Sequence, residues 1–116
     1  MIKAADLLEK KCHHLDTGLT DTEIKDYLSA VEGWALQEGK IVKTFGFKNY
    51  YETLAFINAI AYVIHSEDHH PELVATYNRC IVKFDTHSVN GGRGGISEND
   101  FICVVKVDAI FQQSFA

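Results

Sequence analysis

A chain of 116 residues can build one modest hydrophobic core, and its 47% hydrophobic and 23% charged residues are ordinary for a globular domain. The net charge of −5 argues against a broad nucleic-acid surface, which needs a basic patch, and no apolar run reaches the ~20 residues of a membrane span. The start, Met1 to Lys11, lacks the apolar core of a secretion signal, and three widely spaced cysteines indicate no disulfide framework. We therefore expect a cytoplasmic protein with no membrane or direct nucleic-acid partner.

The N-terminal part divides into two segments. Residues 1–18 show no clear periodicity, so we expect an irregular lead-in to one domain at residues 19–116. Thr20, followed three residues later by Glu23, has the pattern of a capping box and predicts a helix that begins there and ends near residue 30.

The next segments predict a hairpin and a long helix. Residues 34–36 and 40–45 are apolar runs on either side of a turn that contains Gly39, which is typical of a β-hairpin. Residues 48–67 form the longest helical candidate, with Asn49 as its cap. We expect its apolar stripe at Leu54, Ile57, Ala61 and Ile64, widened by Phe56, Ile60 and Val63.

The C-terminal half predicts one more strand and one more helix. Residues 77–85 alternate between polar and apolar side chains, as in a half-buried strand, and residues 73–75 leave room for another short strand. Ser97 with Asp100 predicts the start of a last helix that continues to the C-terminus. This order of elements indicates an α+β fold, with an antiparallel sheet covered on one face by helices.

A cluster of histidines is the main functional signal. His69 and His70 precede Pro71, which disfavours the helical conformation for His70 and predicts an extended segment at a helix exit, with side chains at a rim. His87 follows the predicted strand at residues 77–85. Because imidazoles titrate near neutral pH, three of them around one strand predict a proton-transfer site.

Other motifs favour structural interpretations. Adjacent residues rarely complete a tetrahedral metal site, so the Cys12-His13-His14 segment indicates a mobile surface segment and no metal is expected. Cys80 and Cys103 are expected in the core. The glycine-rich stretch 91–95 lacks the Lys-Ser/Thr of a phosphate-binding loop and predicts a flexible loop.

Taken together, the motifs resemble those of the pterin-4a-carbinolamine dehydratase family. The resemblance covers about residues 19–115 and rests on Gly33-Trp34, Phe45-Gly46-Phe47-Lys48, His69-His70-Pro71-Glu72, Tyr77-Asn78, Thr86-His87 and Ser97-Glu98-x-Asp100. It implies a four-stranded antiparallel sheet with helices on one side. It also implies dehydration of 4a-hydroxytetrahydropterin to quinonoid dihydropterin without a cofactor, which recycles the tetrahydropterin of aromatic amino acid hydroxylases.

The resemblance also implies roles for individual residues. It makes His69 and His87 the acid/base pair, and His70 the group that binds the pterin and its 4a-hydroxyl. Asp100 matches an acidic position of the catalytic set, and as a helix cap it has a structural role that is compatible with the first. The expected substrate-binding residues are Asp68, His69, His70, Pro71, Asp85, Thr86 and His87. Leu73, where many members carry an aromatic residue, and the glycine-rich loop depart from the family pattern.

The sequence is also compatible with two other functions, and it predicts an oligomer. A pterin-related protein of molybdopterin metabolism would retain similar motifs, and the family includes a dimerisation cofactor of a transcription factor. We expect a homodimer or homotetramer, formed through a sheet edge or the last helix. That helix carries more apolar residues than one contact face requires: Phe101, Ile102, Val104, Val105, Val107, Ile110 and Phe111.

Overall fold

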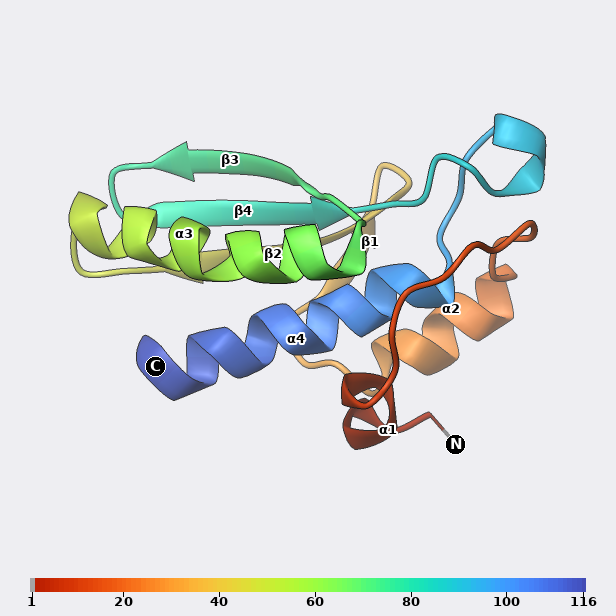
Figure 1. Cartoon of the computed structure of the whole chain (residues 1–116), viewed down its shortest axis with the longest axis horizontal. Coiled ribbons are helices and arrows are strands. Elements are labelled where there is room, and N and C mark those ends of the chain that lie inside the picture. The colour runs from red at the N-terminus through yellow and green to blue at the C-terminus, as the bar shows by residue number, and fades with distance from the viewer. Residues whose placement is uncertain (1) are drawn as a thin grey trace.

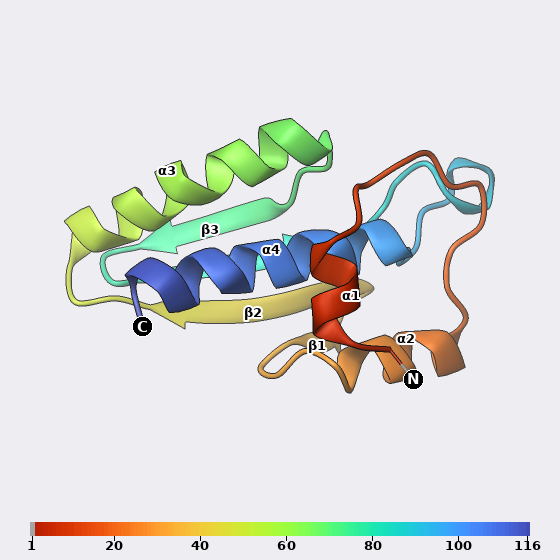
Figure 2. The same ribbon diagram turned by 60° about the horizontal axis from the view of Figure 1, so that its bottom comes forward.

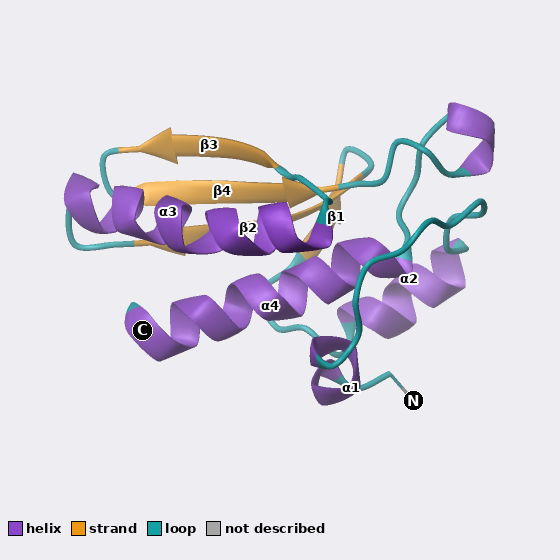
Figure 3. Ribbon diagram, viewed as in Figure 1, coloured by secondary structure: helices purple, strands orange, loops and turns teal. Residues whose placement is uncertain are grey.

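The computed structural model describes residues 2–116, and its helices and strands from residue 19 onward follow the predicted order (Figures 1 and 3). The helices are α1 (Ala4–Leu8), α2 (Asp21–Leu28), α3 (Tyr50–Glu67) and α4 (Glu98–Ser114), with a 3-10 turn, η1, at Asn90–Gly92. The strands are β1 (Ala35–Gln37), β2 (Lys40–Gly46), β3 (Glu72–Thr76) and β4 (Arg79–Phe84). They form one antiparallel sheet in the order β1-β2-β4-β3. The predicted α+β class and the four-stranded sheet are therefore confirmed.

Helices α3 and α4 cover one face of the sheet, and α1 and α2 lie near the N-terminal half of α4 (Figure 2). The core between these layers is rich in phenylalanine, and Phe45, Phe56, Phe84 and Phe101 are fully buried. Such rings remove large apolar areas from water and pack as tilted and edge-on pairs. No helix within residues 2–116 has both the length and the apolar character needed to cross a membrane.

The predicted helix starts are confirmed by their caps. Thr20 Oγ1 accepts a hydrogen bond from the Glu23 amide at 3.2 Å, and the Glu23 carboxylate accepts one from the Thr20 amide at 2.8 Å. Asn49 caps α3 through the Glu52 amide. Each cap satisfies amide groups that have no partner inside the helix.

The buried face of α3 differs from the expected stripe. Phe56, Ile60 and Val63 face the core, whereas Leu54 is 39% exposed and Ala61 lies on the surface. The helix carries apolar residues on more than one face, so periodicity alone cannot identify the face that the sheet will cover.

Most of the apolar residues that were expected to form an intermolecular contact on the last helix are buried within the monomer. Phe101, Ile102, Val104, Val105 and Val107 are all buried in α4. This helix lies between the sheet, α3 and α1, so it contacts protein on several sides. The apolar composition of α4 therefore gives no support to an intermolecular contact.

The N-terminal segment has more structure than the expected irregular lead-in. Helix α1 contacts α4, and the Leu7 side chain is 2% exposed. A single buried leucine in one and a half turns is too short a pattern for periodicity to reveal. The segment before residue 19 thus contributes to the same core as the rest of the chain.

We expect Leu7→Ala to lower the free energy of unfolding by about 2–4 kcal/mol, because it leaves a cavity where a buried leucine packs. Leu8→Ala is the matched control: Leu8 is 46% exposed, and its change should cost less than about 1 kcal/mol. Urea unfolding of the three proteins measures both effects. Equal stability of Leu7→Ala and the wild type would show that α1 is not part of the folded domain.

Candidate functional site

The antiparallel register of β3 and β4 brings the predicted site residues to one edge of the sheet. Glu72, at the start of β3, pairs with Lys83 near the end of β4. The residues just before β3 therefore lie beside those just after β4. This places His69 and His70 next to the segment 85–87, although more than a dozen residues separate them in the chain.

A left-handed residue directs the chain from α3 into this edge. Asp68 has φ 50° and ψ 42° and ends α3. After this turn the His69 side chain points inward, where it is 13% exposed and stacks on Phe84 at a centroid distance of 6.0 Å. The expectation of a purely rim-exposed His69 is therefore wrong, because the sharp turn after α3 directs its ring against the core.

Asp100 is the buried partner of His69. Its carboxylate is fully buried, and Asp100 Oδ1 lies 2.6 Å from His69 Nε2. Asp100 Oδ2 accepts hydrogen bonds from the Thr86 hydroxyl at 2.8 Å and the Ser97 amide at 2.9 Å. Asp100 thus acts both as the cap of α4 and as the histidine partner, and the two interpretations of this residue are compatible.

Thr86 is held in place for this contact. Its amide and carbonyl form two backbone hydrogen bonds with Gly95, at 2.8 and 3.0 Å, and its hydroxyl lies 2.7 Å from Ser97 Oγ. The end of the stretch 91–95 therefore lies beside the residue that follows β4. Asn90, just before this stretch, accepts a 3.1 Å hydrogen bond from the Gly18 amide. The predicted loop is present, and it begins with the turn η1.

The other two histidines lie on the open side of the site. His70 is exposed, and His87 has a side chain that is 78% exposed, with Nε2 3.4 Å from Asp85 Oδ1. A pocket of about 170 Å³ is lined by Asp68, His69, His70, Asp85, Thr86, His87 and Ser88. Six of the predicted site residues therefore lie together around this pocket, whereas Pro71 and Asp100 do not line it. Ser88 was not predicted, and no sequence signal distinguishes it.

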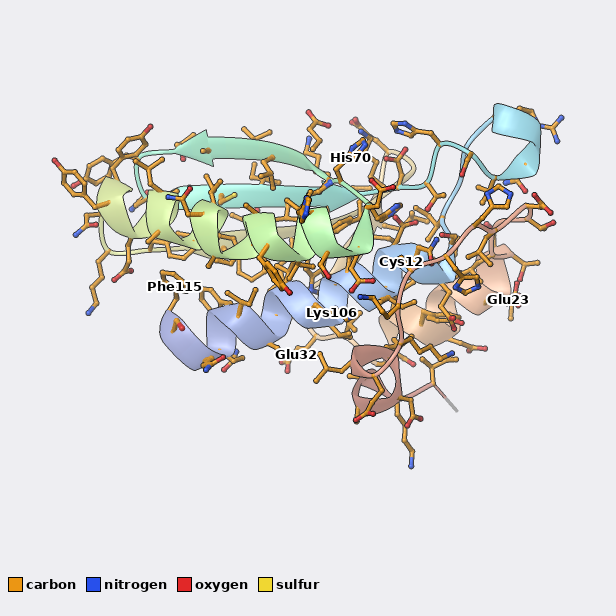
Figure 4. The ribbon with its side chains drawn as sticks, viewed as in Figure 1. Cys12, Glu23, Glu32, His70, Lys106 and Phe115 are labelled. Atoms are coloured by element: carbon orange, nitrogen blue, oxygen red, sulfur yellow. The ribbon has the colours of Figure 1, made fainter. Side chains whose placement is uncertain are left out.

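A second hollow of about 330 Å³ adjoins the first and shares Asp68, His69, Thr86 and Ser88 with it. Its other wall is formed by residues 10–16, here called the N-terminal strap, which contribute Cys12, His13, His14 and Leu15. In Figure 4, Cys12 lies where this strap passes α4, and His70 lies at the edge of the sheet. The sequence missed this wall because the strap lies far from the histidine motifs along the chain.

Two buried polar side chains hold the strap. Glu67 Oε1 accepts a hydrogen bond from the Cys12 amide at 2.8 Å, and Asn99 bonds both the amide and the carbonyl of His13, at 3.3 and 2.6 Å. Residues 12–14 are therefore a surface segment, as predicted, with His13 and His14 exposed, and hydrogen bonds attach this segment to α3 and α4. The sequence near residues 12–14 could not predict these attachments, because both hydrogen-bond partners, Glu67 and Asn99, belong to helices far away in the chain.

The negative charge of Glu67, which holds the strap, is balanced by Lys106. Burial raises the pKa of Glu67, but the 2.7 Å hydrogen bond from Lys106 and the bond from the Cys12 amide outweigh it, so the pKa lies below its ordinary value. Glu67 is therefore an anion at neutral pH, and it accepts hydrogen bonds from the strap and from α4 together. Within residues 2–116, no group of three or more His, Cys, Asp or Glu side chains is arranged to hold a metal ion.

Comparisons with known proteins show the family to which this chain belongs. The family model described as pterin 4 alpha carbinolamine dehydratase matches residues 17–110. A Bdellovibrio bacteriovorus protein with the provisional name pterin-4-alpha-carbinolamine dehydratase is 59% identical over 116 residues, which cover 100% of this chain and 97% of that protein. A Nitrosomonas eutropha protein of the same provisional name is 46% identical, over 95% of this chain and 97% of that one.

A solved structure from Brucella melitensis, described as a transcriptional coactivator/pterin dehydratase, has a TM-score of 0.73 and 33% identity. The match covers 81% of this chain and 98% of that one. The α+β fold thus has a counterpart among solved structures, and nearly the whole chain has counterparts in sequence. The chain belongs to the pterin-4a-carbinolamine dehydratase family.

Proposed function

We propose that this protein is a hydro-lyase that dehydrates 4a-hydroxytetrahydropterin to quinonoid dihydropterin. The observation that carries the proposal is the 2.6 Å contact between His69 and the buried Asp100, in a pocket that also holds His70 and His87. A fixed imidazole beside two exposed ones suits a reaction in which one proton is delivered and another removed.

The reaction needs two proton transfers. The 4a-hydroxyl takes a proton, the C4a–O bond breaks and water leaves. The neighbouring ring N–H then gives its proton to a base, and its electron pair forms the C=N bond of the quinonoid product. Each substrate molecule thus gives one molecule of product and one of water. Each transfer typically contributes about 10²–10⁴-fold, which imidazole groups supply without a cofactor.

The contacts in the pocket support a division of roles. Asp100 as a carboxylate only accepts hydrogen bonds, so His69 carries its shared proton on Nε2, and Nδ1 is left without that bond. We assign His69 and His87 as the acid/base pair and His70 as the group that binds the pterin and its 4a-hydroxyl. Asp68, Asp85 and Thr86 lie on the same wall, where they can bind the pterin ring.

The direct test follows the decay of 4a-hydroxytetrahydropterin with and without the protein. We expect the protein to accelerate the decay, and His65→Gln to behave like the wild type, because His65 is an exposed imidazole on α3 that lines neither pocket. A decay rate unchanged by the protein, at concentrations where it is folded, would refute the proposal. Turnover restricted to a pterin of molybdopterin metabolism would favour that branch of function.

The assembly and the biological setting are part of the same proposal. We expect a cytoplasmic homodimer or homotetramer that recycles the tetrahydropterin of aromatic amino acid hydroxylases. Because α4 is buried within the monomer, the exposed edge strands β1 and β3 are the better candidates for the contact. Light scattering that gives a mass of one 13.0 kDa chain at micromolar concentration would exclude this assembly.

A further inference from the structure

Two cysteines that are 91 residues apart in the chain meet beside the second hollow. Cys12 belongs to the N-terminal strap and Cys103 to α4, and their sulfur atoms lie 3.6 Å apart. We propose that this pair is an oxidation site, at which peroxide produces a disulfide that fastens the strap to α4. The proposal does not depend on the reaction at the histidines.

Exposure decides which sulfur reacts first. Cys12 is half-buried and lines the second hollow, whereas Cys103 is fully buried. A dissolved oxidant therefore reaches Cys12, and Cys103 is the neighbour that resolves the oxidised sulfur. Cys80, which is buried in β4, gives an internal comparison within the same chain.

The chemistry balances with hydrogen peroxide as the oxidant. The Cys12 thiolate attacks one peroxide oxygen, the O–O bond breaks, and the products are a sulfenic acid and hydroxide, which takes the former thiol proton and becomes water. The Cys103 sulfur then attacks the sulfenic sulfur, the S–O bond breaks, and a second water leaves with the Cys103 proton. Two thiols lose two electrons and two protons, and one peroxide becomes two waters.

The surroundings of Cys103 set the order of rates. The hydrogen bond with Cys12 and burial both raise the pKa of the Cys103 thiol above its ordinary value. Because the thiolate is the attacking form, we expect the second step to be slower than the first. A sulfenic acid on Cys12 should therefore accumulate long enough for dimedone to trap it.

The bond would fix one wall of the site. Hydrogen bonds to Glu67 and Asn99 already hold the strap beside α4, so bond formation requires the two sulfur atoms to approach from 3.6 Å to about 2.05 Å. A crosslink across a loop of this length restricts the unfolded chain, and we expect the melting temperature to rise by on the order of 10 °C. Amide exchange of Cys12 and His13 should slow by about tenfold or more.

The test treats the whole chain with hydrogen peroxide and measures its mass. We expect a loss of about 2 Da, a tryptic peptide pair that joins Cys12 to Cys103, and full reversal by dithiothreitol. Cys12→Ser and Cys103→Ser should each abolish the crosslink, and Cys80→Ser should retain it as the matched control. Cys12→Ser changes a half-buried residue of the strap, so this variant should fold even where Cys103→Ser does not.

Two products of oxidation would overturn the proposed disulfide, and one exchange result would overturn its fastening role. One is oxidation of Cys12 to a sulfinic acid while Cys103 stays a free thiol. The other is a disulfide between two chains, visible as a dimer on a non-reducing gel. Slower amide exchange of the strap in the untreated Cys12→Ser variant than in the oxidised wild type would contradict the fastening role.

Discussion

His69→Gln should lower kcat by about 10²–10⁴-fold, because the amide cannot give or take a proton at neutral pH. The choice of glutamine separates chemistry from packing. Its amide can still donate a hydrogen bond to Asp100, which is fully buried and otherwise loses its partner at 2.6 Å. His69→Ala should lose the same turnover and additionally lower the free energy of unfolding by about 1–3 kcal/mol, since the carboxylate oxygen is left without that partner.

Single-turnover measurements of dehydration, combined with urea unfolding, distinguish the two variants. His65→Gln is the matched control, because it makes the same change on the exposed end of α3 and should leave both quantities near wild type. Turnover within threefold of wild type in a folded His69→Gln protein would exclude His69 as acid or base. Equal stability of His69→Ala and wild type would show that the contact with Asp100 contributes little to the fold.

Local signals predicted most of the fold correctly. Helix starts at Thr20, Asn49 and Ser97 were predicted because capping depends on residues within one turn. Strand β4 was predicted because Cys80, Val82 and Phe84 alternate with Arg79, Lys83 and Asp85, and the three apolar side chains are buried in the core. These patterns need no information from distant parts of the chain.

Features that depend on distant partners could not be predicted in the same way. The strap at residues 10–16 is ordered by Glu67 and Asn99, neither of which is near it in sequence. The exposed side of α3, with Leu54, is chosen by the position of the sheet and not by the pattern of the helix. The histidine cluster was recognised from its motif, but the burial of His69 follows from the left-handed turn at Asp68, which the sequence did not reveal.

Asp100→Asn should also lower kcat strongly, by about 10²–10³-fold, through the tautomer of His69. Two donors, the Thr86 hydroxyl and the Ser97 amide, surround the Oδ2 position and will keep the amide oxygen there. The new NH₂ group then faces His69 Nε2, 2.6 Å away in the native contact, and can only donate to it. Nε2 must become an acceptor, so the proton moves to Nδ1, the nitrogen that the native arrangement leaves without this bond.

Nitrogen-15 spectra of the imidazole rings report this change directly, and a merely structural role of Asp100 would not reverse the tautomer. Asp108→Asn is the matched control in the same helix: Asp108 bonds Trp34 and Lys43 away from the histidine pocket, so its change should leave the His69 spectrum and turnover as in wild type. An Asp100→Asn protein whose His69 keeps its proton on Nε2 would show that the buried carboxylate does not select the tautomer. Lost turnover with that unchanged spectrum would then assign Asp100 to capping α4, through its bond with the Ser97 amide, and would leave the proton transfers to the three histidines alone.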